Sequence, residues 1–198
     1  MIASAAGVFG ESLETFATLI DERGIQQGQD KVLQAYVLST VVNSVCWVEG
    51  AAQELFEMCG RASDPRVQSL DPARRAKVAR LKPPAPTIKK WETLIAELTG
   101  TPLNDTAPAV SEMQLLLWLR NLCVHAEPWH LPSKKGRPED VEAALRSKFT
   151  LNEFPGEAKT FFPHIVLSRG CAAWSFSTAR QFNRYALDQL GLGSLFGA

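Results

Sequence analysis

The sequence has no net charge, no long apolar run and few cysteines. Its 198 residues carry 21 Lys plus Arg and 21 Asp plus Glu, so no global positive field draws the protein toward nucleic acid or a membrane surface. Any site for a polyanion must therefore be local. With 45% hydrophobic and 21% charged residues, the composition is that of one ordinary folded domain with a sizeable core. We expect residues 1–198 to form a single domain.

Apolar stretches such as 115–119 fall far short of the roughly twenty residues that cross a bilayer. The first twenty residues contain no Lys or Arg, and Glu11 and Glu14 interrupt their apolar character. They therefore lack the basic start and clean apolar run of a signal peptide. We expect a cytoplasmic protein that does not interact with a membrane.

Cysteine is scarce and scattered. The chain has Cys46, Cys59, Cys123 and Cys171. Because no CxxC pair occurs, we predict reduced core cysteines rather than a disulfide frame or a zinc site. A metal site built from Cys123, His125 and His130 would be interrupted by Pro128 and would lack a fourth ligand, so no metal or other cofactor is expected. The sequence also has no Gly-rich phosphate loop and no nucleotide-binding βα pattern, which disfavours kinases, GTPases and dehydrogenases.

Helical periodicity dominates the remaining sequence. Between residues 30 and 59, apolar residues recur at alternating spacings of three and four, which predicts one long amphipathic helix that stops at Gly60. In the helix predicted to end before Gly100, the basic residues should face solvent. The fold class is therefore an all-α helical bundle, with residues 149–166 as irregular or extended chain. The other predicted helices cover about 11–22, 87–98, 138–145 and 171–185, the last one closed by Gly191.

One further helix is predicted from Ser111 to about Ala126. Ser111 and Gln114 have the spacing of a capping box, and Pro128 bounds the other end. Because this helix is apolar almost all round, we expect it to be buried.

Charge is unevenly distributed along the chain. Residues 1–60 carry eight acids and two bases, whereas residues 61–90 carry nine bases and two acids. Prolines at positions 83, 84 and 86 prevent a helix from continuing through the basic stretch. We expect an exposed basic connection that contains a short helix.

The predicted helix 111–126 turns polar near its end, at Arg120, Asn121 and His125. Arg120 cannot lose its charge, so it needs a carboxylate, a phosphate or a solvent-filled cleft. An ion pair with Glu49 would satisfy it and would fit an unrelated helical adaptor. His125 could cap the helix, or its pKa near neutrality could let it both accept and donate a proton. The residues alone leave these alternatives open.

The pattern Arg120-Asn121-x-x-x-His125 resembles the Arg-Asn-x-x-x-His signature of HEPN-domain proteins. The resemblance covers most of residues 30–190, with 61–86 and 126–168 as variable, loop-rich insertions. Its context is the preceding apolar run, the long helix carrying Glu49, the exit His125-Ala126-Glu127-Pro128 and a closing helix with Trp174.

This resemblance implies a metal-independent endoribonuclease that cuts single-stranded or looped RNA, of the kind found in toxin or antiviral defence systems. His125 would shuttle protons, Arg120 would bind the phosphate and Asn121 would orient the phosphate or the histidine. Glu49 and Glu127 would support the site. The resemblance also implies a homodimer with a composite active site, and an antitoxin or other regulatory protein is a further possible partner.

Other residues could contact RNA. Trp129 and His130 could stack on a base, unless this aromatic segment folds back on the bundle. The basic candidates for the phosphate backbone, which would otherwise form a solvated charge run, are Lys134, Lys135, Arg137, Arg74 and Arg75. The alternative function is a catalytically silent HEPN-like module that binds RNA or a protein partner.

Overall fold

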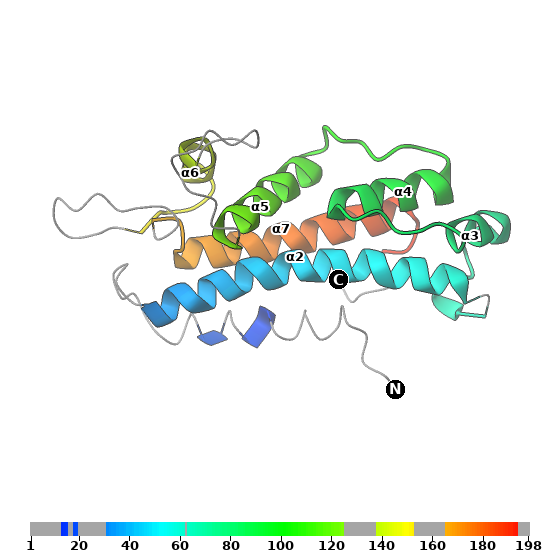
Figure 1. Cartoon of the computed structure of the whole chain (residues 1–198), viewed down its shortest axis with the longest axis horizontal. Coiled ribbons are helices and arrows are strands. Elements are labelled where there is room, and N and C mark those ends of the chain that lie inside the picture. Colours follow the sequence, from blue (N-terminus) through cyan, green and yellow to red (C-terminus); the bar gives the residue numbers. More distant parts are fainter. Residues whose placement is uncertain are drawn as a thin grey trace. The chain divides into compact units, whose positions relative to one another are not determined.

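The computed structural model describes residues 13–15, 18–19, 31–61, 63–124, 138–152 and 165–193. These residues contain no strand, and the predicted all-α helical bundle is confirmed. Residues 13–15 and 18–19 are helical, as expected for the predicted helix 11–22. The elements are α2 (Lys31–Gly60), the short 3-10 helix η1 (Pro65–Val67), α3 (Pro72–Val78), α4 (Thr87–Thr99), α5 (Pro108–Val124), α6 (Pro138–Arg146) and α7 (Arg169–Gln189) (Figure 1).

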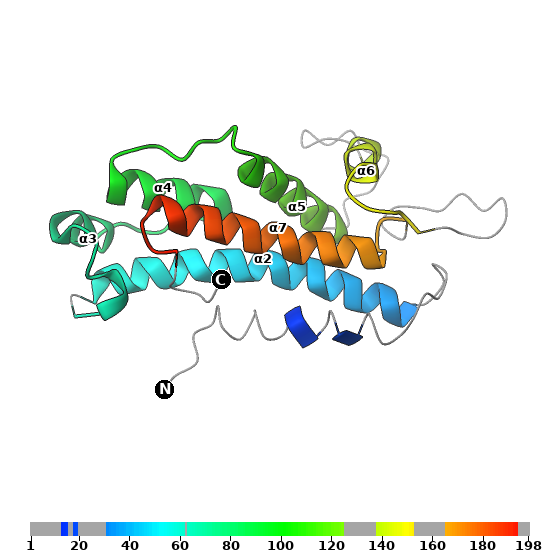
Figure 2. The ribbon, with the colours of Figure 1, turned by 180° about the vertical axis from the view of Figure 1, so that it is seen from behind.

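The chain divides into two compact units. The first unit comprises Met1–Gly10, Cys46–Met113 and Ala179–Ala198, and the second comprises Glu11–Val45 and Gln114–Thr178. The boundaries between them fall inside α2, α5 and α7. Within each unit, the segments of α2 and α7 lie side by side and run in the same direction, as both views show (Figures 1 and 2).

Helix α2 buries the apolar stripe that its sequence predicts. Its most apolar 18-residue window has a mean hydropathy of 1.2, so length and composition alone would allow α2 to span a bilayer. Core helices meet the same criterion, and the spacing of three and four residues among the buried positions is that of a core-facing helix. Of the predicted stripe, Val41, Val45, Val48, Ala52 and Leu55 are buried, whereas Leu38 is half-buried and its neighbour Val37 is buried instead.

Trp91 is the centre of the first unit's core. It is fully buried, and its ring meets Phe182 of α7 edge to face, with the ring centroids 6.0 Å apart. Its indole Nε1–H donates a hydrogen bond of 3.1 Å to the backbone carbonyl of Val48 in α2. Trp91 therefore connects α4 to both α2 and α7. Helix α4 ends as predicted, because Gly100 adopts the left-handed conformation, with φ of 81°, that closes it.

The basic connection contains a short helix, as expected. Asp71 caps α3, because its carboxylate accepts hydrogen bonds from the backbone N–H groups of Ala73 and Arg74 at 2.8 and 3.0 Å. Helix α3 packs against α4, and an ion pair of 2.5 Å between Lys77 Nζ and Glu97 Oε2 joins the two helices.

In the second unit, the irregular chain next to α6 is held against the start of α7. The Ser168 hydroxyl donates a hydrogen bond of 2.7 Å to the carbonyl of Thr150, and its oxygen accepts one from the N–H of Cys171 at 3.2 Å. The rings of Phe149 and Trp174 meet with centroids 5.7 Å apart. The described part of 149–166 therefore lacks regular structure, as predicted, but its polar groups are hydrogen-bonded.

Helix α5 differs from its prediction in two respects. It begins at Pro108 rather than Ser111, and the N–H of Ser111 is already bonded to the carbonyl of Ala107 at 3.1 Å. The expected capping box is therefore wrong, because Ser111 lies inside the helix and does not precede it. Proline suits the first helical position, since its missing N–H would have no partner there. Nor is α5 buried all round: Leu115, Leu117, Trp118 and Leu122 are half-buried, and Val124 is 49% exposed.

Candidate functional site

The candidate site begins in the last two turns of α5, in the second unit. Leu116 and Leu119 are fully buried and fix this part of the helix against its core. Arg120 and Asn121 follow directly and are half-buried. On a helix, Arg120 borders the buried Leu116–Leu119 face, so its stem can cover apolar surface while the charged head reaches water.

The guanidinium of Arg120 and the amide of Asn121 have no hydrogen-bond or ion-pair partner in the part of the chain that the structure describes. The next motif residue, His125, lies outside the described residues, directly after the end of α5 at Val124. Two of the three motif residues are thus placed on one helix end, without a polar partner among the described residues.

Glu49, which the sequence suggested as a partner of Arg120, pairs with Lys90 instead. Its Oε1 lies 2.6 Å from Nζ of Lys90, in an ion pair between α2 and α4. Glu49 is thus paired within its own unit, and no carboxylate among the described residues of the second unit pairs with Arg120. Glu49 lies in the first unit and Arg120 in the second.

Lys90 also corrects the expectation that the basic residues of α4 all face solvent. Its neighbour Lys89 is exposed, but Lys90 is only 8% exposed. A buried lysine needs a carboxylate nearby, and Glu49, whose side chain is 37% exposed, provides one. This ion pair joins α2 to α4 next to Trp91, so Glu49 has a structural role there.

Arg74 lies at the C-terminal end of α4. A Cβ atom added to Gly100 would come within 2.9 Å of Arg74 Nη1, so the guanidinium lies directly against this glycine. A positive charge at this position complements the exposed carbonyl groups of the last helical turn. Arg74 is half-buried, and its place indicates a structural interaction within the first unit.

Arg75 is also half-buried. Burial raises the pKa of the Cys59 thiol, and the nearby charge of Arg75 partly opposes that rise. The helix period could have indicated the places of both arginines, because Val78 is fully buried and positions three and four before it share its helix face. RNA contacts by Arg74 and Arg75 stay a prediction, but both arginines lie beside the buried face of α3.

The exposed cations of this region are different residues. Arg80 and Lys82 are exposed, and the described residues provide no ion-pair partner for either. Both belong to the basic stretch 61–90 that the sequence shows, in which Arg74 and Arg75 were the residues named as candidates for RNA contacts.

The four cysteines are free thiols, as predicted, but only Cys59 and Cys171 are buried in the core, whereas Cys46 and Cys123 are half-buried. Burial raises the pKa of Cys123 to about 12. Burial also raises the pKa of Cys171, and the proximity of Cys123 raises it further. Both thiols lie in the second unit, and their raised pKa values favour the protonated form at neutral pH, which is the less nucleophilic form. In the described part of the chain, no three His, Cys, Asp or Glu side chains are grouped as a metal would require.

The remaining candidates cannot be placed. Glu127, Trp129, His130, Lys134, Lys135 and Arg137 all lie outside the described residues.

Comparison with protein-family models, with curated proteins and with solved structures gave no match. The functional interpretation therefore rests on the motif residues and their surroundings.

Proposed function

We propose that the protein is a metal-independent endoribonuclease of the HEPN type. The observation that carries the proposal is the uncompensated charge of Arg120. Within the described residues, this arginine of a largely apolar helix has no carboxylate, and Glu49, the best candidate for that role, is paired with Lys90. A phosphate would supply the missing negative charge, and the planar guanidinium is suited to bind it through two hydrogen bonds.

In the proposed reaction, the 2′-hydroxyl of RNA attacks the adjacent phosphorus atom. His125 accepts the proton of this hydroxyl as the new oxygen–phosphorus bond forms. The bond from phosphorus to the 5′-oxygen then breaks, and that oxygen receives a proton from a histidine in its acidic form. The products are a 2′,3′-cyclic phosphate and a 5′-hydroxyl end. Arg120 stabilises the negative charge that builds up on the phosphate oxygens, and Asn121 orients the phosphate or the histidine.

The spacing of the motif supports a composite site in a homodimer. Residues five apart on a regular helix are separated by about 140° around the axis and by about 7.5 Å along it. One copy of Arg120 and His125 would thus present a splayed pair. Two copies related by a twofold axis would let the arginine of one protomer converge with the histidine of its partner. An antitoxin or other regulatory protein is the further partner of a toxin-type enzyme, and the cytoplasm is the proposed location.

The test is a gel assay of RNA cleavage in EDTA, with total cellular RNA as the substrate. Arg120→Ala and His125→Ala should each lower the cleavage rate by about 10²- to 10³-fold, as the loss of one charge-stabilising group does in other enzymes. Arg146→Ala is a matched control, because Arg146 is an exposed arginine of the second unit that pairs with Glu142. Its rate should equal that of the parent protein.

The ends of the fragments provide a second readout. The parent protein should leave cyclic phosphates, and all variants should show the same dimer content in sedimentation. Equal cleavage by the parent, Arg120→Ala and His125→Ala would refute the proposed site. Complete inactivity of folded, dimeric parent protein toward RNA would favour the alternative, a silent module of the same fold type that binds RNA or a protein partner, to which the zero net charge also points.

A further inference from the structure

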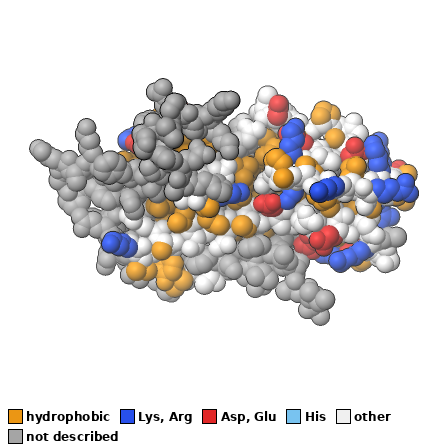
Figure 3. Space-filling model, in the orientation of Figure 1, with side chains coloured by type: hydrophobic (Ala, Val, Ile, Leu, Met, Phe, Trp, Pro, Cys, Tyr) orange, Lys and Arg blue, Asp and Glu red, His pale blue; other side chains and the backbone are white. Residues whose placement is uncertain are grey.

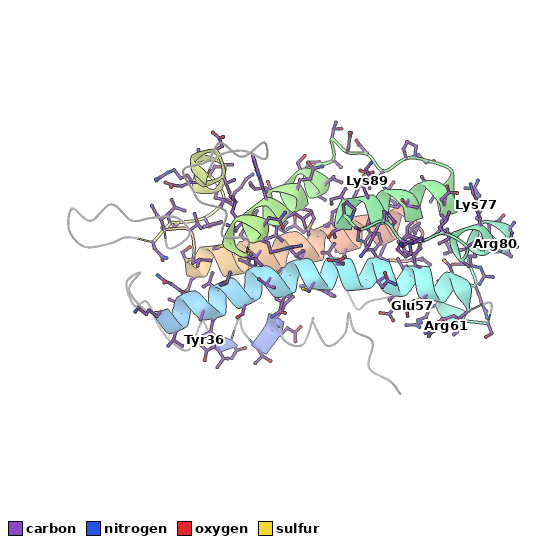
Figure 4. All side chains as sticks on the ribbon, in the orientation of Figure 1. Tyr36, Glu57, Arg61, Lys77, Arg80 and Lys89 are labelled. Atoms are coloured by element: carbon purple, nitrogen blue, oxygen red, sulfur yellow. The ribbon has the colours of Figure 1, made fainter. Side chains whose placement is uncertain are left out.

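A group of exposed cations lies in the last turn of α3 and directly after it, in the first unit. Lys and Arg side chains gather over α3 and α4 in the space-filling view (Figure 3). Lys77 and Arg80 lie close together near the end of α3, whereas Lys89, in the first turn of α4, lies apart from them (Figure 4). We name Lys77, Arg80 and Lys82 the α3 basic surface; all three are exposed.

The acids of this region are already engaged. Asp64 binds the guanidinium of Arg66, with Oδ2 2.8 Å from Nη2, and Asp71 caps α3 through backbone N–H groups. On α4, Glu97 pairs with Lys77 and Glu92 with Lys89. Across the described chain, this leaves Arg80 and Lys82 without a carboxylate, so the α3 basic surface keeps a positive charge.

The backbone that carries these cations is held in place. Val78 is fully buried, and the N–H groups of Arg80 and Leu81 donate to the carbonyls of Lys77 and Val78 at 3.1 and 2.9 Å. Lys82 precedes Pro83, which restricts its backbone to extended conformations. Because the backbone is already ordered, binding through these side chains loses less conformational entropy than binding through a free loop would.

The surface lacks what a protein partner would need. Protein interfaces depend on buried aromatic or aliphatic anchors at their centre. Among the described residues, the large apolar side chains that are clearly exposed are Val32 and Val124, and neither belongs to the α3 basic surface. Charge without an apolar anchor fits the phosphate backbone of a nucleic acid, whose binding is dominated by lysine and arginine contacts.

We propose that the α3 basic surface binds the phosphate backbone of single-stranded RNA, with Arg80 and Lys82 as the contacting residues. The proposal rests on the proposed function for its choice of RNA over DNA. Within the basic stretch 61–90, it assigns the phosphate contacts to Arg80 and Lys82 rather than to Arg74 and Arg75. Since backbone contacts carry no base information, this surface holds RNA without sequence preference and leaves selection of the cleavage site to other residues.

The test measures binding and does not depend on cleavage. The probe is a fluorescent 2′-O-methyl oligouridylate of about 16 nucleotides, which cannot be cut by 2′-hydroxyl attack. Its affinity for the full chain is measured by fluorescence anisotropy at several salt concentrations. Arg80→Gln/Lys82→Gln should weaken binding at low salt and reduce the slope of log K against log salt by about 1.4, or about 0.7 for each lost phosphate contact.

The matched control removes the same charge elsewhere. Arg146→Gln/Arg184→Gln replaces two exposed arginines, each of which pairs with an acid four residues away. This double variant should keep the parent slope. Equal slopes for the parent and the Arg80/Lys82 variant, or an equal loss in both double variants, would overturn the proposal. Binding of polyglutamate but not of oligouridylate would also overturn it, in favour of an acidic protein segment.

The outcome is independent of catalysis. If the parent binds the probe through Arg80 and Lys82 but cleaves no RNA, the α3 basic surface stands and the proposed nuclease function fails. If the Arg80/Lys82 variant cleaves RNA with unchanged rate and salt dependence, the proposed nuclease function stands and the proposed role of the α3 basic surface fails.

Discussion

Lys90 places a positive charge on the buried face of α4, and Arg120 places one on the largely apolar α5, but the surroundings of the two charges differ. In the first unit, Lys90 is buried and has Glu49 at 2.6 Å. In the second, Arg120 is half-buried, and no carboxylate in the described chain pairs with it. A charge with its own counterion contributes to the fold, whereas a charge without one is available to a ligand. Four pairs of variants follow; three are matched between the two units, and both members of the fourth pair lie in the first unit.

The largest effect is expected from the core of the first unit. Trp91→Ala removes a fully buried ring that packs on Phe182 and a hydrogen bond to Val48. It should lower the free energy of unfolding by about 3–5 kcal/mol. Trp174→Ala is the matched change in the second unit, where the half-buried ring contacts Phe149, and it should cost about 1–2 kcal/mol. Urea denaturation followed by circular dichroism measures both values. A larger loss of stability for Trp174→Ala than for Trp91→Ala would contradict this prediction, which follows from the deeper burial of Trp91.

The second pair tests the two cations directly. Lys90→Met removes the partner of Glu49 and should lower the free energy of unfolding by about 1–2 kcal/mol, less than for a fully buried pair because Glu49 is partly hydrated. Arg120→Met breaks no ion pair and should change stability by less than about 0.5 kcal/mol, while RNA cleavage falls by about 10²-fold or more.

The measurements for this pair are urea denaturation and the cleavage assay on the same samples. A double-mutant cycle with Lys90→Met, Glu49→Gln and the Glu49→Gln/Lys90→Met double variant isolates the coupling energy between the two side chains. A stability loss for Arg120→Met as large as that for Lys90→Met would mean that Arg120 is structural, and the proposed phosphate role would be abandoned.

The sequence predicted the helices better than the state of their charges. The stripe along α2, the closing Gly100 of α4 and the short helix in the basic connection follow from local periodicity and backbone preference, which act within a few residues. The pairing of Glu49 with Lys90 joins residues 41 positions apart, so no local pattern could indicate it. The places of Arg74 and Arg75 were partly readable, because the buried Val78 defines the inner face of α3.

The third pair concerns alkaline pH. Burial raises the pKa of Cys123 from 9.0 to about 12, so the unfolded chain loses this proton at a lower pH than the folded chain does. The stability that this thiol contributes is complete below pH 9.0 and is lost as the pH rises toward about 12. Cys123→Ala should therefore make the pH dependence shallower, by at most about 1.4 kcal/mol per pH unit.

Cys59→Ala is the counterpart in the first unit. Its effect should be smaller, because the charge of Arg75 opposes the rise that burial causes in the pKa of Cys59. Urea denaturation at pH values between about 9 and 11 measures both slopes. Equal slopes for the parent and Cys123→Ala would show that this thiol ionises alike in the folded and unfolded chains.

The smallest effect tests whether Arg74 belongs with Lys90 among the cations engaged by the fold. Gly100→Ala and Gly191→Ala both place alanine at a left-handed position, with φ of 81° and 68°, and each should cost about 1–2 kcal/mol for this reason alone. A Cβ at Gly191 meets nothing within 4 Å, whereas one at Gly100 comes within 2.9 Å of Arg74 Nη1. Gly100→Ala should therefore cost a further amount of about 0.3–1 kcal/mol, because the guanidinium must leave the end of α4. In the Arg74→Ala background, this excess should vanish from the urea denaturation curves. An excess that persists there would come from the backbone alone, and Arg74 would return to the cations available for RNA.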